Sequence, residues 1–249
     1  QGLNYVKTIS AAKHKHNLVA TVSQQFSRDV SNNTYVAGYN IPSNDIQVVS
    51  GVAQSDLYGS SSYAASALVS LLGQVQYDMD KKYLLYLTYR ADASSRFGDN
   101  SKWGYFPAVG AGWIVSDEKF MDWSKPVVDF MKLRFSFGVA GNQSSDFYAP
   151  YNSYQYGGYY NGVQSIQPSY TNGLTKNNLT WAKNKQKNIG LDLYMFKNRL
   201  NISVDLYDKL SKDDYYNFDL PFYTGFDNVL FNAHDLWVSN RGVDLTILA

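Results

Sequence analysis

Cysteine is absent from this 249-residue chain, which excludes a disulfide framework, a thiolate nucleophile and a thiolate metal site. No stretch reaches about 18 uninterrupted apolar residues, so a transmembrane helix is also excluded. A membrane β-barrel remains open, because barrel strands are only about ten residues long and alternate in polarity. Charged residues are scarce, at 17% of the chain against the roughly 25% usual in soluble domains. The net charge of +1, without a basic run, argues against nucleic-acid binding.

Aromatic residues, in contrast, are abundant: 22 Tyr, 13 Phe and 5 Trp make up 16% of the chain. Residues 83–93 place aromatic or aliphatic side chains at the odd positions, whereas Thr88, Arg90 and Asp92 are polar. A period of two over this length predicts a strand with one apolar face and one polar face. Residues 103–115 predict a second strand of the same kind.

Further segments alternate in the same way, and none of the chain reads as a convincing amphipathic helix. Together the alternating segments predict roughly nine strands. Besides the two strands above, they are residues 2–11, 17–26, 64–77, 131–139, 188–195, 200–207 and 243–247.

The connections between these segments differ in length in a regular way, which predicts an antiparallel meander with short connections at one end and long ones at the other. Outer-membrane barrels have short periplasmic turns and longer extracellular loops, whereas a soluble β-sandwich gives no reason for such segregation. The short connections are residues 12–16, 78–82 and 197–199, the long ones are 27–62, 141–180 and 211–235, and 93–103 and 117–129 are intermediate.

The composition of the two faces indicates where each face lies. The polar rows hold mainly Ser, Asn, Gln, Gly, Asp, Arg and Tyr, which suits a barrel lumen better than a Lys- and Glu-rich surface in bulk water. Tyr83, Trp103, Tyr105 and Trp113 lie near strand ends, as in interfacial aromatic girdles, although cross-strand pairing in a soluble sheet is the alternative. We predict an all-β fold, a segment of an antiparallel transmembrane β-barrel. The competing hypothesis is a soluble, aromatic-rich β-sandwich that acts as a glycan-binding module or adhesin.

Residues 83–208 contain an ordered series of short motifs. The series begins with Arg90-Ala-Asp92-Ala-Ser94-Ser95-Arg96-Phe97-Gly98, Trp103-Gly104, Phe106-Pro107 and Gly112-Trp113. It continues with Lys132-Leu-Arg134, Gly141-Asn142-Gln143, Leu179-Thr-Trp181, Asn188-Ile-Gly190-Leu-Asp192, Asn198-Arg199-Leu200 and Val204-Asp205-Leu-Tyr207-Asp208. Order and spacing together resemble the signature of SusC/RagA-type TonB-linked outer-membrane transporters, the large nutrient transporters of Bacteroidetes. The similarity is looser before residue 68 and after residue 235.

The resemblance implies a 22-stranded outer-membrane barrel with an N-terminal plug. It also implies energy from the TonB complex, a SusD-like lipoprotein as a lid, and import of oligosaccharides or peptides. On this basis, residues 1–249 are expected to be part of the β-barrel domain and to supply about nine strands. The plug, the TonB box and the closing strand are expected to lie outside this chain. Outer-membrane lipid and glycan or peptide cargo are expected contacts.

The signature residues are expected to have structural roles. Gly110 and Gly112 leave the polar row without side chains, so that a plug or a neighbouring strand can approach closely. Arg90 and Asp92 share the polar face and can pair with each other, with lumen partners or with substrate. The pair Gly141-Asn142 at a strand end predicts a turn. The signature set is Arg90, Asp92, Ser95, Arg96, Phe97, Gly98, Trp103, Gly104, Pro107, Gly112, Trp113, Gly141, Asn142 and Gln143.

The tyrosine-rich stretch from residue 148 to 170 is the best candidate for a binding site. A tyrosine ring offers a flat apolar face for a sugar or peptide, and its hydroxyl can form hydrogen bonds. Contact with cargo, contact with a partner protein and packing within the loop all remain open. The candidate residues are Tyr148, Tyr151, Tyr154, Tyr156, Tyr159 and Tyr160.

No motif indicates an enzyme, a cofactor or a metal site. A G-x-S-x-G nucleophile elbow is missing from the sequence. His14-Lys-His16 lies in an expected short turn without a nearby carboxylate companion, so both histidines are expected to be solvated and to bind no metal. Asp78-x-Asp80 and Asp213-Asp214 do not make a full calcium loop and are expected to be solvated loop charges.

Overall fold

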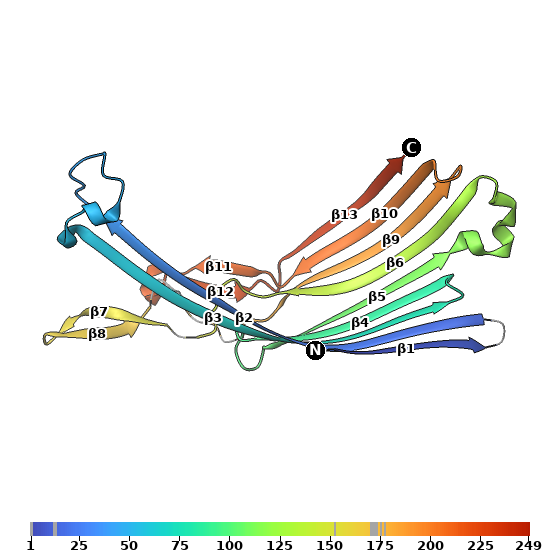
Figure 1. Ribbon diagram of the computed structural model, residues 1–249. Coiled ribbons are helices and arrows are strands. Elements are labelled where there is room, and N and C mark those ends of the chain that lie inside the picture. The colour runs from blue at the N-terminus through green and yellow to red at the C-terminus, as the bar shows by residue number, and fades with distance from the viewer. Residues whose placement is uncertain (1, 12–13, 152, 170–173, 175, 177) are drawn as a thin grey trace.

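The computed structural model describes residues 2–11, 14–151, 153–169, 174, 176 and 178–249. Its main element is one curved antiparallel sheet of nine strands, which confirms the predicted meander (Figure 1). Along the central part of the sheet the strands alternate between an apolar and a polar face, as the sequence pattern predicts. In sheet order the strands are β1 (Gly2–Ala11), β2 (His14–Gly38), β3 (Leu57–Met79), β4 (Tyr83–Ser94), β5 (Trp103–Ile114), β6 (Val128–Asn142), β9 (Ala182–Met195), β10 (Leu200–Lys212) and β13 (Trp237–Leu248).

The competing β-sandwich is wrong, because the strands form a single curved sheet and not two large sheets packed face to face. Two small two-stranded sheets accompany it in the described part of the chain. One pairs β7 (Tyr154–Tyr160) with β8 (Val163–Pro168), and the other pairs β11 (Tyr215–Asp219) with β12 (Asn228–Asn232). Both are hairpins inside connections that the sequence pattern left as long loops.

The short connections gather at one end of the sheet and the long ones at the other, as expected, and the two intermediate connections lie at opposite ends (Figure 1). The turns that join β1 to β2, β3 to β4 and β9 to β10 lie at one end, together with the connection from β5 to β6. The four remaining connections lie toward the other end, and they include residues 39–56 and the two hairpins. By the rule for outer-membrane barrels, the first end is periplasmic and the second is extracellular.

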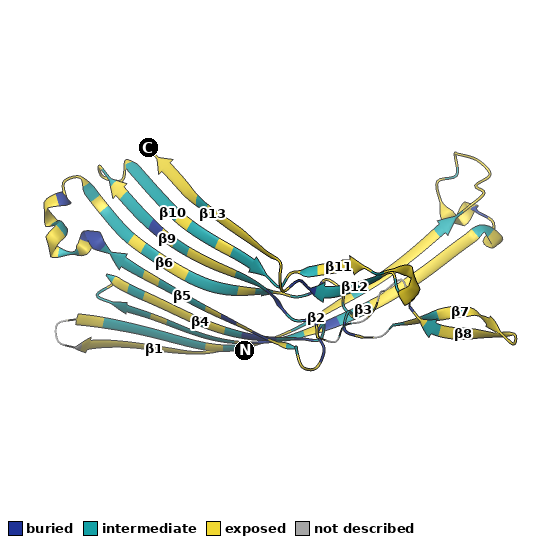
Figure 2. Ribbon diagram, turned by 180° about the vertical axis from the view of Figure 1, so that it is seen from behind, coloured by how far each residue is buried: buried dark blue, intermediate teal, exposed yellow. Residues whose placement is uncertain are grey.

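The predicted loop at residues 27–62 is largely wrong, because β2 and β3 continue as a paired ribbon up to Gly38 and Leu57. The ribbon extends beyond its neighbours, since β1 pairs with β2 only up to Ser23 and β4 pairs with β3 only down to Leu68. Figure 2 shows most of the far half of this ribbon in the colour of exposed residues. Both of its faces lie outside the apolar band, so polar residues occupy both, and the alternation that marks the other strands is lost.

Helices are few and short in the described residues. All are 3₁₀ helices: η1 (Val49–Gly51), η2 (Gln54–Asp56), η3 (Val115–Asp117), η4 (Lys119–Ser124) and η5 (Phe222–Thr224). None of these helices is long and apolar enough to cross a membrane.

The buried core lies at the extracellular rim and not in the middle of the sheet. Phe97, Phe106, Leu179 and Trp181 form the buried cluster of the described residues, and each is at most 6% exposed. The sheet itself is one layer, so its strands gain no such core from a second layer within this chain. The connections that follow β4 and precede β9 therefore pack on each other at the rim.

Candidate functional site

One face of the sheet is apolar across almost its full width. Residues directly opposite each other on neighbouring strands share a face. One row of such residues runs through Val243, Leu206, Ile189, Phe135, Ala111, Leu85, Tyr77 and Leu18. Most side chains in this row are exposed, from 38% for Leu85 to 64% for Val243, whereas Tyr77 and Leu18 are half-buried. A soluble surface rarely exposes a continuous apolar patch of this extent, so this face meets lipid.

Aromatic side chains mark the height of the apolar face on β5. Trp103 and Trp113 share the outward row and stand ten residues apart. At ~3.3 Å per residue this separation is ~33 Å along the strand, and a strand tilt of ~40° reduces it to roughly 25 Å, the height of a barrel's apolar band. Tyr83 stacks on Trp113 with ring centroids 6.4 Å apart, and Tyr89 stacks on Tyr105 at 6.2 Å. The aromatic residues thus form two levels, as in interfacial girdles.

The opposite face carries an ion cluster centred on Arg134 of β6. The guanidinium donates to Asp192 at 2.7 and 3.0 Å and to Asp205 at 3.0 Å. Gly190 lies beside it on β9, and a Cβ there would come within 2.7 Å of Arg134 Cζ. Glycine therefore lets the guanidinium cross β9 to reach Asp205 on β10. The motifs in the sequence contain these residues, but their pairing depends on the strand register, which the motifs do not specify.

Arg90 and Asp92 form the ion pair that the sequence offered as one alternative. Arg90 Nε donates to both carboxylate oxygens of Asp92 at 2.8 Å, and Arg90 Nη2 donates to Ser70 Oγ at 3.1 Å. Asp92 is 6% exposed and needs this partner. The pair lies on the polar face near the rim.

A hollow lies on the polar face below this pair. Its volume is ≈ 410 Å³. Gly110 and Gly112 form part of its floor, and a Cβ at Gly112 would lie 3.1 Å from Lys132 Cε and 3.3 Å from Leu84 Cδ1. The missing side chain at Gly112 thus lets side chains of adjacent strands lie over β5, and the close approach of a plug or a neighbouring strand stays a prediction. Tyr86, Ser136 and Asn188 also line the hollow.

Signature residues at the rim pack around Trp181. Phe97 is fully buried with its ring centroid 4.9 Å from that of Trp181, and the Phe106 ring lies 5.4 Å away on another side. Trp181 Nε1 donates to the carbonyl of Lys102 at 3.0 Å. Gly104 and Gly141 leave room for these rings, since a Cβ at Gly104 would lie 2.9 Å from Trp181 and one at Gly141 would overlap Phe106.

Arg96 ties the β2–β3 ribbon to the connection that leads into β7. It donates to Ser66 Oγ on β3 at 3.2 Å and to the carbonyl of Ser144 at 2.9 Å. Its guanidinium also lies 4.0 Å from the ring centroid of Phe147. The neighbouring Ser95 Oγ accepts from the backbone N–H of Ala67 at 2.9 Å. This bond satisfies the edge of β3 just beyond Ser94, the last residue of β4.

The remaining signature residues also lie at or near the rim. Gln143 accepts from Ser94 Oγ at 2.8 Å. The predicted turn at Gly141-Asn142 is wrong, because both residues end β6. The carbonyl of Asn142 accepts from the hydroxyl of Tyr215, and burial raises the pKa of this tyrosine above its ordinary value. Gly98 accepts from Ser101 in the β4–β5 turn. Pro107 lies on β5 just beyond the pairing with β6, which begins at Ala108.

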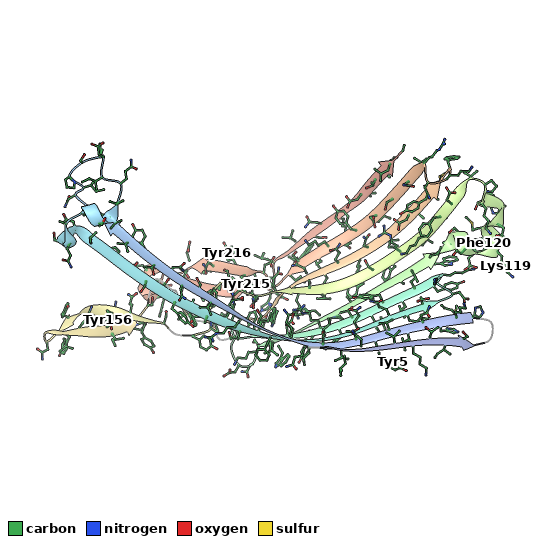
Figure 3. All side chains as sticks on the ribbon, viewed as in Figure 1. Tyr5, Lys119, Phe120, Tyr156, Tyr215 and Tyr216 are labelled. Carbon is green, nitrogen blue, oxygen red and sulfur yellow. The ribbon has the colours of Figure 1, made fainter. Side chains whose placement is uncertain are left out.

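The six candidate tyrosines divide into two groups. Tyr148 and Tyr151 lie in a turn that precedes the β7–β8 hairpin. The Tyr148 hydroxyl accepts from the backbone N–H of Ala65 in β3 at 3.1 Å. The other four lie on the β7–β8 hairpin and are 67–80% exposed. Figure 3 shows Tyr156 on this projecting hairpin. Tyr170 lies outside the described residues.

A β-bulge in the hairpin gathers three of the tyrosines on one face. The register shifts between Tyr156 and Tyr159, which pair with Ile166 and Gln164. Residues three apart on a regular strand point to opposite faces, but the extra residue keeps both side chains on the same face. Tyr154, Tyr156 and Tyr159 therefore lie together with Ile166, whereas Tyr160 lies opposite with Val163.

His14 and His16 belong to β2 and each has a partner, so the expectation of a turn without a nearby carboxylate is wrong, although the His14 side chain remains 53% exposed. His14 bonds Asp80 of the facing turn, and His16 Nδ1 lies 2.7 Å from the Tyr77 hydroxyl. The bond from His14 lowers the pKa of Asp80. In the described part of the chain, no three His, Cys, Asp or Glu side chains gather as a metal site would require.

A curved antiparallel sheet with a lipid-facing apolar band, a polar inner face and segregated connections defines a segment of a membrane β-barrel. Residues 3–248 match the model of the family described as TonB dependent receptor-like, beta-barrel. The chain belongs to this family, and it is part of an outer-membrane protein.

Curated relatives agree with this assignment. TonB-dependent receptor P39 of Formosa agariphila is 38% identical over 205 residues, which cover 82% of this chain and 19% of that protein. TonB-dependent receptor SusC of Bacteroides thetaiotaomicron is 30% identical over 194 residues, which cover 74% of this chain and 18% of that protein. The chain thus spans about a fifth of the length of these relatives.

Solved structures show the same fold. The RagAB peptide importer in its 'closed-closed' state superposes with a TM-score of 0.84 at 23% identity, covering 99% of this chain and 26% of that chain. The siderophore receptor PirA from Acinetobacter baumannii superposes with a TM-score of 0.54 at 13% identity, covering 99% of this chain and 33% of that chain.

Proposed function

We propose that this chain is a nine-stranded wall segment of a TonB-dependent importer that takes up oligosaccharides or peptides together with a SusD-like surface lipoprotein. The observation that carries the proposal is the single sheet with a lipid-facing apolar band and a polar inner face with paired charges. Support comes from the similarity to a receptor named SusC and from the fold shared with a peptide importer. The relatives are named as receptors, and we assign the protein no enzymatic activity.

All of residues 1–249 belong, in this proposal, to the β-barrel domain. The inner face would meet a plug contributed by sequence outside this chain, and the TonB complex would also act on sequence outside it. The Arg134 cluster and the Arg90–Asp92 pair then stiffen the wall by pairing charges on its inner face.

The β7–β8 hairpin is the proposed contact site for the cargo or for the lipoprotein. Residues 147–175 contain no charged residue. Tyr154, Tyr156 and Tyr159 offer an exposed aromatic face on a hairpin, and a two-stranded hairpin alone is only marginally stable in water. Neutral rings and amides suit an uncharged sugar or a polar protein surface equally well.

Uptake by cells that express the full-length protein tests the proposal. The double substitution Tyr156→Ala and Tyr159→Ala is expected to lower uptake of labelled oligosaccharides or peptides by about tenfold, because aromatic anchors carry much of the energy of a contact. Tyr160→Ala on the opposite face is the matched control and should have little effect. Uptake by the wild type should also stop when a protonophore removes the energy that drives TonB.

Two readouts identify the contact. Loss of lipoprotein on co-purification assigns the tyrosine face to the lid, whereas weaker cargo binding with an intact complex assigns it to the cargo. Unchanged uptake by the double variant would reject the tyrosine site. Uptake by the wild type that survives the protonophore would reject a TonB-dependent importer.

A further inference from the structure

The connection from β5 to β6 contains a 3₁₀ helix with three distinct rows of side chains. In a 3₁₀ helix, residues three apart lie one above the other. In η4, Phe120 and Trp123 are therefore in register and are 58% and 80% exposed. Lys119 and Asp122 form a charged row, and Met121 and Ser124 form the row that faces the protein, where Ser124 is buried. The helix is amphipathic with a period of three.

The aromatic row continues the lipid-facing band of the sheet. Phe120 packs edge-on against Trp113, with ring centroids 6.2 Å apart. Trp113 belongs to the outward row, in which it lies opposite Leu133 of β6 and Tyr83 of β4. Figure 3 places Phe120 and Lys119 at the end of the sheet where the short turns gather. The row of Phe120 and Trp123 thus begins next to Tyr83 and Trp113, the aromatic residues at the periplasmic edge of the apolar face.

Two carboxylates of this connection are paired beside the aromatic row. Glu118 accepts from the Tyr83 hydroxyl at 2.7 Å and from Trp113 Nε1 at 3.3 Å, and these bonds lower its pKa, so the carboxylate stays ionised. Lys125 pairs with Asp122 at 2.6 Å. Lys119, with three donors and a flexible stem, can reach a phosphate oxygen. Paired charges of both signs suit a zwitterionic headgroup layer.

We propose that η4 is an interfacial anchor that inserts Phe120 and Trp123 into the headgroup region of the periplasmic leaflet, with its charged row among the phospholipid headgroups. A phospholipid surface fits better than a protein because the aromatic row is continuous with the lipid-facing face of the sheet. Aromatic rings with a polar edge favour this depth of a bilayer. This inference rests on membrane insertion of the barrel and not on its cargo.

Spin labels in the full-length protein, reconstituted in phosphatidylethanolamine–phosphatidylglycerol vesicles, test the anchor. This chain contains no cysteine, so a single introduced cysteine labels one position of it once native cysteines elsewhere are replaced by serine. Phe120→Cys and Trp123→Cys report on the aromatic row, and Asp122→Cys is the matched control on the charged row. Leu87→Cys and Asp45→Cys serve as references for the apolar band and for water.

The ratio of oxygen accessibility to nickel-chelate accessibility is expected to be several-fold higher at positions 120 and 123 than at position 122, and lower than at position 87. Ratios at 120 and 123 equal to that at position 45 would overturn the proposal and leave the aromatic row free for a periplasmic protein. Hydroxyl-radical footprinting of the unsubstituted protein gives a second measurement. Trp123 should be oxidised several-fold less than Tyr223, which is 88% exposed on the extracellular side; equal oxidation would contradict the anchor.

Discussion

Replacing Val75 by arginine is expected to cost about 2–4 kcal/mol of barrel stability, the penalty for a cation facing lipid at the bilayer midplane. Val75 lies opposite Leu87 of β4, and Leu87 lies opposite Val109, near the middle of the stretch between Trp103 and Trp113. The row of Val75, Leu87 and Val109 faces lipid, so the guanidinium of an arginine at position 75 would have no polar partner. Urea unfolding of the full-length protein in vesicles measures the loss.

Gln76→Arg is the matched control for this prediction, because it makes the same cation at the next residue of the same strand. Gln76 pairs with Tyr86 and lines the hollow on the inner face. The arginine side chain would enter a polar lumen there and should change stability by no more than about 0.5 kcal/mol. Equal effects of the two substitutions would contradict the assignment of the faces.

Phe97→Ala is expected to destabilise the extracellular rim by about 3–5 kcal/mol, the usual cost of truncating a buried phenylalanine. The side chain is fully buried against Trp181, and the packed loops have no other large buried cluster in the described residues. The strands of the wall do not depend on this cluster. The variant should therefore still insert, while its extracellular loops become sensitive to protease added to whole cells.

Phe222→Ala provides the control, since the same atoms are removed from a side chain that is 100% exposed on the extracellular side. Its loops should be cleaved at the wild-type rate. A Phe97→Ala protein as resistant to protease as this control would mean that the rim core does not hold the loops. Failure of Phe97→Ala to insert at all would mean that the core also supports the wall.

The wall could be predicted from the sequence because its two faces meet different surroundings. Residues 131–139 alternate cleanly, and they form the central part of β6 between lipid and lumen. The outer half of the β2–β3 ribbon lacks this contrast, since both of its faces are outside the band. Many residues of these paired strands are therefore Ser, Asn or Gly, and such a composition predicts a loop.

The details of the sites could not be predicted because they depend on register and on local irregularities. Arg134 meets Asp205 only across β9, at a distance that Gly190 permits. Tyr156 and Tyr159 share a face only because of a bulge that their spacing hides. The side-chain pattern of η4 repeats every three residues, because η4 is a 3₁₀ helix. A test for the α-helical period of 3.6 does not detect this pattern.

A spin-label scan along β4, from Leu84 to Tyr89 in the full-length protein in vesicles, tests the central claim most directly. The account predicts that labels at 85, 87 and 89 are accessible to oxygen from the lipid, whereas labels at 84, 86 and 88 are not. The alternation follows from the outward row that contains Leu85 and Leu87 and from the inner row that contains Leu84 and Tyr86. Equal accessibility at all six positions, or the reverse alternation, would contradict a sheet that separates lipid from a polar lumen.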